Sequence, residues 1–265
     1  MSACLAPLIT CEHAVNVVPP AYGPLLRGFE DLLASHRGYD RGALETARRL
    51  AEAVGAPVLA TAVTRLLIDC NRSEGHPGLY SEVTKPLPAK ARQAIRDAHH
   101  RPHWQAVAAT VTRLLAEADT VAHIASHSFV PRLGGLTRRC DVGFLYDPAR
   151  PAEKRFCLAW RDALAALDAG LVLRRNYPYR GVADGLVTAF RRRFGQRYLG
   201  VELEVNQRFA RAGGEAFDRI NRLLAASLAA ALGRDDGGGA APELAANDPY
   251  NPAALGRDDG GGAAP

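Results

Sequence analysis

The sequence predicts an α/β fold in which a largely parallel β-sheet is covered by helices on both faces. Two observations predict it. Short apolar runs alternate along the chain with longer amphipathic stretches, which is the pattern of strands connected by helices. Clusters of polar residues directly follow several of the apolar runs. Because ligand sites in such sheets lie in the loops beyond the carboxyl ends of the strands, we expect these clusters to form one site.

The predicted elements follow one another in regular order. The helix expected at 43–54 has apolar residues at helical spacing and stops at Gly55, a residue type that often ends helices. Pro102 separates two helices expected at 89–99 and 104–117, because proline interrupts the hydrogen bonds of a helix interior. The other predicted helices cover 152–168, 184–194 and 215–231. The predicted strands cover 8–11, 58–62, 66–69, 121–126, 142–146, 172–174 and 198–205.

The composition predicts one folded part and one unfolded part. The 265 residues fit one large domain or two small ones, and 48% are hydrophobic, which suffices for a buried core. Residues 230–242 and 253–265 both read AALGRDDGGGAAP, a perfect repeat. Two copies are too few for a solenoid, and this composition cannot bury a core. We therefore predict a folded domain over 1–232 and a disordered low-complexity tail over 233–265.

The formal charge of +5 is unevenly distributed along the chain. The residues after Leu232 carry a net charge of −4, which leaves +9 on residues 1–232. A basic domain raises nucleic-acid binding as an alternative function, with Arg191–Arg193 as contact residues. We disfavour it because only 7% of the residues are aromatic, no nucleic-acid-binding motif is present, and arginines at a helix end also suit a solvated face.

The cysteine pattern predicts a cytoplasmic protein. Cysteines occur at 4, 11, 70, 140 and 157 with no CxxC spacing, so reduced thiols are the simplest interpretation. The N-terminus lacks the basic segment of a signal peptide, and no apolar run approaches the about 18 residues that a membrane helix requires. We therefore expect a soluble protein that does not associate with membranes.

Three residues are candidate metal ligands. His13 follows the first predicted strand, and His127 stands where the strand at 121–126 breaks into a loop. Histidine at such a position suits a metal ligand or a base. His123 shares a strand face with His127 but lies farther from the loops, so we expect it to be structural. Asp40 precedes the helix at 43–54, where it suits either a helix cap or a metal ligand.

Two glutamates in the last predicted strand are the most suggestive feature of the sequence. Glu202 and Glu204 stand two residues apart, so both lie on one face and repel each other unless a cation or a proton intervenes. A carboxylate near an activated water is a general base. Two histidines, one aspartate and a remote glutamate match a zinc hydrolase whose fourth metal position is open. The HExxH, GxGxxG, GxxxxGK[ST] and GxSxG motifs are absent, which excludes the enzyme classes built on them.

A third polar cluster predicts a binding site for a small carboxylate. The run TRLLIDCNR at 64–72 gathers Arg65, Asp69, Asn71 and Arg72. Arginine and asparagine donate hydrogen bonds that suit a substrate carboxylate, and Asp69 would orient an arginine, although a structural Arg–Asp bridge is an alternative. Arg180 belongs to the loop at 176–185, whose glycine, proline and tyrosine residues suit either a pocket wall or an ordinary loop.

Together and in this order, six motifs resemble the N-formylglutamate amidohydrolase family. They are CEHAVNVVP (11–19), HRGYDRGA (36–43), TRLLIDCNR (64–72), HSF-P (127–131), NYPYRGVADG (176–185) and GVELEVNQ (200–207). The resemblance covers roughly residues 5 to 230. It implies a three-layer α/β/α sandwich with a mixed, largely parallel sheet, similar to that of zinc peptidases. It also implies a zinc-dependent amidohydrolase that cleaves an N-formyl or N-acyl amino acid such as N-formylglutamate, in the cytoplasm and in histidine degradation.

The resemblance also implies the metal ligands. His13, Asp40 and His127 would bind one Zn²⁺, with Glu45 as the alternative third ligand. Another N-acyl amino acid or a peptidoglycan amide is the alternative substrate. A metal-free, inactive family member is the third possibility that we consider.

The remaining roles also follow from the resemblance. Asn71 and Arg72 would hold a substrate carboxylate, with Arg65 and Asp69 beside them. Glu204 would be the general base, and Glu202 would support it. This choice between the two glutamates rests on the position of Glu204 before Asn206 and Gln207, and the opposite choice stays open.

Overall fold

The computed structural model describes residues 4–233, and within them six strands form the central sheet. In spatial order they are β2 (Val58–Ala60), β1 (Leu5–Cys11), β3 (Thr120–Phe129), β8 (Tyr198–Asn206), β6 (Val142–Leu145) and β7 (Leu173–Arg175). Neighbouring strands are parallel except β6 and β8, which are antiparallel. The predicted mixed, largely parallel sheet is therefore confirmed.

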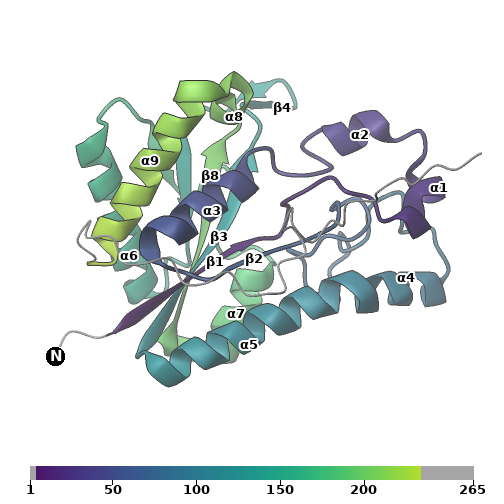
Figure 1. Cartoon of the computed structure of the whole chain (residues 1–265), viewed down its shortest axis with the longest axis horizontal. Coiled ribbons are helices and arrows are strands. Elements are labelled where there is room, and N and C mark those ends of the chain that lie inside the picture. The colour runs from purple at the N-terminus through teal and green to yellow at the C-terminus, as the bar shows by residue number, and fades with distance from the viewer. Residues whose placement is uncertain (1–3, 234–265) are drawn as a thin grey trace, which may run out of the picture.

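Helices cover both faces of this sheet, as Figure 1 shows. One face packs against α3 (Ala43–Val54), α6 (Pro151–Leu167) and α9 (Gly214–Ala231), and the other packs against α5 (Arg101–Glu117) and α7 (Leu186–Phe194). Successive residues of a strand serve the two layers in turn, since Ile9 belongs to the first core and Leu8 to the second. The predicted three-layer α/β/α sandwich is confirmed.

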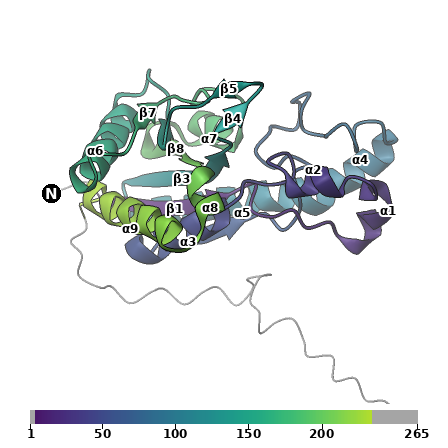
Figure 2. The same cartoon turned by 90° about the horizontal axis from the view of Figure 1, so that it is seen from above.

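A lobe beside the carboxyl ends of β1 and β3 carries the shorter helices. It contains α1 (Gly23–Leu26), α2 (Glu30–Ala34), α4 (Ala89–Ile95) and the long connection from 61 to 88, and both views show these helices together at one end of the molecule (Figures 1 and 2). The structure also contains a hairpin of β4 (Arg132–Leu133) and β5 (Leu136–Thr137) and a short helix, α8 (Arg208–Ala212).

The strand predicted at 66–69 is wrong. The segment forms turns in the lobe, where Leu67 and Ile68 pack with Leu79 and Ile95 in a separate small core. A short apolar run reports burial and does not by itself report which element buries it. The turn also positions Asp69, whose backbone N–H donates to the carbonyl of Leu79.

The helix break predicted at Pro102 is also wrong. The helix runs from α4 through a π-helical segment, Arg96–His100, directly into α5. The N–H of Arg101 bonds the carbonyl of Arg96, and Pro102 then falls in the first turn of α5, where a missing N–H is tolerated. The chain continues as one long helix that buries both His100 and His103.

The C-terminal end of the described chain and its helices relate to the predicted tail and to the predicted lack of a membrane helix. The last helix, α9, ends at Ala231. The predicted disordered tail lies outside the described residues, apart from Gly233. In the part of the chain that the structure describes, no helix combines the length and the apolarity needed to cross a membrane.

Candidate metal centre

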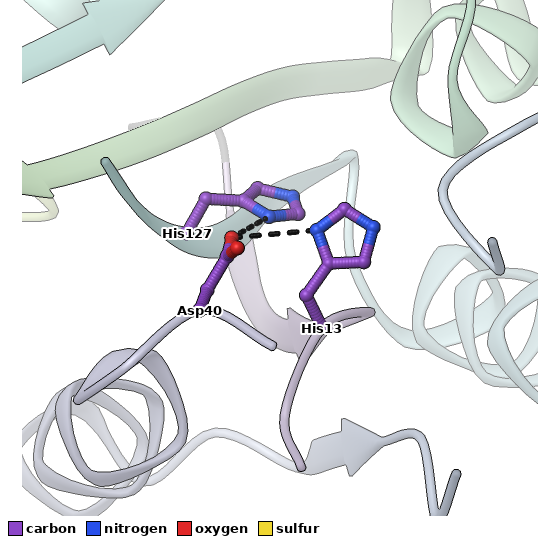
Figure 3. A group of neighbouring side chains, drawn as sticks. All are labelled: His13, Asp40 and His127. Carbon is purple, nitrogen blue, oxygen red and sulfur yellow. Dashed lines mark hydrogen bonds and ion pairs between the residues drawn. The ribbon is translucent and has the colours of Figure 1, made fainter. Parts of the chain in front are cut away.

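The structure brings His13, Asp40 and His127 together at the carboxyl ends of two strands. His13 follows β1, His127 lies in β3, and these strands are parallel neighbours, so their carboxyl ends meet. The loop before α3 supplies Asp40, whose N–H donates to the carbonyl of His13. One carboxylate oxygen of Asp40, Oδ2, lies 3.3 Å from Nδ1 of His13 and 3.1 Å from Nδ1 of His127 (Figure 3).

This donor set fits a zinc ion. The three ligand atoms lie within 4.8 Å of one another, and all three side chains are buried. Two imidazole nitrogens and one carboxylate oxygen are the ligands of a catalytic zinc site, which keeps a fourth position open. Burial alone would raise the pKa of Asp40, but the two histidines outweigh it and hold that pKa below its usual range. Asp40 is therefore ionised, as a metal ligand must be.

The alternative third ligand lies elsewhere. Glu45 is in the first turn of α3, and its carboxylate accepts a hydrogen bond from Nε of Arg49 at 2.8 Å. Nearly half of its side chain is exposed. The geometry thus gathers Asp40, and not Glu45, with the two histidines.

A second carboxylate lies behind each imidazole. Nε2 of His13 is 2.7 Å from Oδ1 of Asp69, and Nε2 of His127 is 3.3 Å from Oε2 of Glu12. Histidines that bind metals commonly donate their other N–H to a carboxylate. Asp69 was predicted to orient an arginine, and it does contact Arg65, whose Nη2 donates to Oδ2 at 2.6 Å. Its contact with His13 was not predicted.

Arg65 forms the partly open edge of the site. Its Nη1 lies 3.6 Å from Oδ1 of Asp40, and a quarter of its side chain is exposed. Beside it a cavity of about 390 Å³ is lined by Asp69 and by basic side chains that include His36, Arg37 and Lys85. Arg37 is paired with Glu82 at 2.6 Å. This volume suits a small molecule, and the excess of basic groups suits an anion.

The polar groups of the predicted Asn–Arg pair are bonded to protein atoms. Nδ2 of Asn71 lies 3.3 Å from Nε2 of His127 and 3.4 Å from Oε1 of Glu202, while Oδ1 accepts the N–H of Leu186 at 3.1 Å. Nη1 of Arg72 donates to the carbonyl of Asp184 at 2.5 Å. Asn71 is therefore inside the site, whereas the guanidinium of Arg72 holds the start of α7.

Glu204 is the carboxylate nearest in register to His127. Strands β3 and β8 pair His127 with Glu204 and Ala125 with Glu202, so Glu204 lies closer to the strand end. Its Oε2 is buried and has no hydrogen-bond partner among the described residues. Burial, helped by the charges of Asp40 and Glu202, raises the pKa of Glu204 to about 8. A carboxyl group in this state is suited to gain and lose a proton near neutral pH.

The loop at 176–185 passes over β6 beside Glu204. A Cβ atom at Gly143 of β6 would overlap the carbonyl oxygen of Tyr177 and lie 3.4 Å from Cβ of Glu204, so glycine there lets the loop approach. Arg180 is exposed. The sequence analysis missed Tyr179, whose hydroxyl accepts a hydrogen bond from Nη1 of Arg138 at 3.1 Å. Burial and the charge of Glu204 both raise the pKa of Tyr179.

His123 and Arg191 have structural roles outside the site. His123 is buried between the hydroxyls of Thr10 and Tyr198, as a structural histidine would be. Arg191, the first residue of the basic triplet, is neither solvated nor available to a nucleic acid. It is buried, bonds both carboxylate oxygens of Glu153 at 3.0 and 3.1 Å, and donates to the carbonyl of Gly200.

Comparisons with known proteins agree with this architecture. The sequence model described as N-formylglutamate amidohydrolase matches residues 5–210. A gene product of Agrobacterium tumefaciens has a similar structure, with a TM-score of 0.73 and 29% identity over 88% of this chain and 91% of that chain. The N-formylglutamate amidohydrolase of Ralstonia eutropha shares the fold, with a TM-score of 0.64 and 19% identity over 87% of this chain and 94% of that one. None of the curated proteins matches.

The family match spans the strands and loops that carry His13, Asp40, His127 and Glu204, and it confirms the resemblance found in the six motifs. The chain belongs to the N-formylglutamate amidohydrolase family and is a hydrolase that acts on amide bonds.

Proposed function

We propose that this hydrolase depends on zinc and cleaves the amide of an N-formyl or N-acyl amino acid such as N-formylglutamate. The observation that carries the proposal is the cluster of His13, Asp40 and His127 beside the unpartnered carboxyl group of Glu204. Family membership supports the type of bond. When bound, zinc supplies a Lewis acid that makes water more acidic and polarises a carbonyl group.

Glu204 moves the proton in this proposal. Its ionised carboxylate accepts a proton from the attacking water, and the resulting carboxyl group gives it to the leaving amine. The raised pKa of Glu204 makes its carboxylate a stronger base for the first step, while the positive charge of Arg65 opposes the increase and helps to keep the group ionised before that step. Glu202, held by Asn71, lies two register pairs deeper in β8 and supports Glu204.

The basic edge of the site binds the carboxylate of the substrate. Arg65 is the residue best placed for first contact, because it is partly exposed and lies within reach of both Asp40 and the cavity. Asn71 lies behind this edge, Arg72 is bonded to the carbonyl of Asp184, and Arg180 faces solvent in the loop at 176–185. A cavity of about 390 Å³ favours a single acylated amino acid over a peptidoglycan fragment.

The proposed setting is the cytoplasm, with histidine degradation as the pathway. All five cysteines of the sequence lie in the described residues and are free thiols, and four of them are buried. Free thiols are typical of a reducing compartment. The pathway follows from the proposed substrate alone.

A substrate screen tests the proposal. The zinc-loaded chain is given N-formylglutamate, N-formylaspartate, N-acetylglutamate, an uncharged N-formyl amino acid amide and a muropeptide, and amine release is measured. We expect hydrolysis of an N-formyl or N-acyl amino acid and a large loss when its carboxylate is blocked. Hydrolysis of the muropeptide alone would support amide hydrolysis but refute an N-acyl amino acid as the substrate. No hydrolysis of any amide by the zinc-loaded chain would overturn the proposal.

A further inference from the structure

Glu12 is a buried carboxylate for which the proposed reaction has no use. It lies directly after β1, and its side chain is fully buried. Side chains alternate along the strand, so Glu12 follows Thr10 on the side that faces α5. Burying an ionised carboxylate is unfavourable unless strong partners compensate for the lost water.

The partners of Glu12 are unusual for a structural carboxylate. Among the described residues, both of its ion pairs are with histidines: Oε1 lies 3.5 Å from Nε2 of His103, and Oε2 lies 3.3 Å from Nε2 of His127. Oε2 has no aligned hydrogen bond to any described residue. Buried polar atoms are rarely left in this state, so the arrangement calls for a reason beyond stability.

Glu153 shows what a structural buried glutamate looks like in this chain. Its oxygens bond Nε of Arg191, and they also accept the backbone N–H groups of Asp147 and Gly200 at 3.0 and 3.1 Å. Glu12 has no such arginine and no such backbone donors among the described residues, although it is equally buried. The contrast separates a carboxylate that holds the fold from one that faces a functional histidine.

The ring of His127 has an acid at each nitrogen. Nδ1 faces Asp40 at 3.1 Å, where the metal ligands meet, and Nε2 faces both Oε2 of Glu12 and the amide nitrogen Nδ2 of Asn71 at 3.3 Å. Because an amide nitrogen only donates, Glu12 is the acceptor for Nε2 among the described residues. An imidazole that binds a metal through Nδ1 carries its proton on Nε2, and that N–H needs an acceptor. His13 shows the same arrangement, with Asp69 at its Nε2.

His103 reaches Glu12 because of the π-helical segment. His103 is in the first turn of α5, directly after Arg96–His100, and its side chain is almost fully buried. The extra residue of a π-turn rotates the following helix relative to the preceding one, and such turns often occur near functional sites. His103 follows such a turn, and its Nε2 lies 3.5 Å from Oε1 of Glu12.

We propose that Glu12 and His103 are positioning residues of the metal site. Glu12 accepts the Nε2–H of His127 and so directs Nδ1 toward the metal, while His103 fixes the carboxylate of Glu12. This inference rests on the proposed zinc site. It adds two residues that touch neither metal nor substrate.

Zinc affinity tests the inference independently of activity. The dissociation constant is measured by competition with a chromophoric chelator for the wild type, Glu12→Gln, His103→Gln and the matched control His123→Gln. His123 is a buried histidine in β3, the strand that carries His127, but its side chain bonds Thr10 and Tyr198. We expect the affinity to fall about 10- to 100-fold in Glu12→Gln, by less in His103→Gln, and by no more than about twofold in the control.

A spectroscopic measurement on the wild type decides the case if the variants do not fold. In the zinc-loaded chain labelled with ¹⁵N-histidine, we expect a proton on Nε2 of His127 and none on Nδ1. A proton on Nδ1, or an unchanged zinc affinity in folded Glu12→Gln, overturns this inference and leaves the proposed function standing. A wild-type chain that binds no zinc overturns both.

Discussion

Single residues of this site have their roles set by their neighbours. Asp40 lies between two imidazoles and is ionised, whereas burial without a hydrogen-bond partner for Oε2 raises the pKa of Glu204 to about 8. The two-residue spacing of the glutamates and the family resemblance pointed to Glu204, and the resemblance favoured Asp40 as a ligand over a helix cap. The sequence did not identify Glu12 or Tyr179. Their importance depends on which side chains surround them, and a single sequence does not carry that information.

If Asp40 is a metal ligand and Glu45 is not, replacing them should have very different effects on zinc affinity. Asp40→Asn removes the anionic ligand, so we expect zinc affinity to fall by more than about 100-fold, beyond the usual effect of a supporting residue. Glu45→Gln is the matched control, because Glu45 pairs with Arg49 on the surface. Chelator competition on both variants checks the prediction. Equal zinc affinity in the two variants would argue against Asp40 as a ligand.

The proton-transfer assignment predicts a loss of rate without a loss of metal. Glu204→Gln cannot exchange a proton, so we expect kcat to fall about 10²- to 10⁴-fold, the range for a general acid–base residue, while zinc stays bound. Glu202→Gln keeps a group that can bond Asn71 and should lose far less. Steady-state kinetics and zinc analysis on both variants check this. A larger loss in Glu202→Gln would exchange the two roles.

Individual elements place these residues, and two of them differ from the sequence prediction. The apolar run at 66–69 forms a turn that carries Asp69 to His13, and the helix containing Pro102 continues through a π-segment. The apolar run correctly indicated a buried segment, and Pro102 correctly indicated a missing N–H. The outcome depended on distant partners such as Leu79 and Ile95, which the local sequence does not reveal.

Helix α7 is held to the sheet and to the loop at 176–185 by one buried arginine. Arg191 bonds Glu153 and the carbonyls of Gly181 and Gly200. Arg191→Ala leaves Glu153 buried with fewer partners, and we expect the free energy of unfolding to fall by about 3–5 kcal/mol. Arg192→Ala, at an exposed position of the same helix, should change it by less than about 0.5 kcal/mol. Urea unfolding measures both, and equal effects would contradict the structural role of Arg191.

The stability of the whole molecule should depend on pH through His123. Burial lowers the pKa of His123 to about 4, whereas its ordinary value is 6.5. As the pH falls below 6.5, the unfolded chain binds a proton that the folded chain refuses, so stability decreases until the pH reaches the folded pKa. Between pH 8 and pH 5 this histidine should remove about 2 kcal/mol of stability. Urea unfolding should show that loss in the wild type but not in His123→Gln, and identical pH dependence in both would refute it.

At the scale of the whole fold, sheet topology explains why polar clusters far apart in the sequence meet. Strands β1, β3 and β8 are parallel neighbours, so the residues that end them share one edge of the sheet. The alternation of strands and helices was therefore enough to predict the layers and the place of the site. It was not enough to predict that β6 runs antiparallel to β8, because strand direction depends on how the connections cross the sheet. The family resemblance implied a mixed sheet but not which strand runs antiparallel.

The central claim is that amide hydrolysis depends on one zinc ion held by His13, Asp40 and His127. The most direct measurement follows turnover of N-formylglutamate by the chelator-treated chain while zinc is added back. We predict no turnover without metal and full recovery at one zinc per chain, with no recovery in Asp40→Asn. Full turnover by the metal-free chain would contradict the claim.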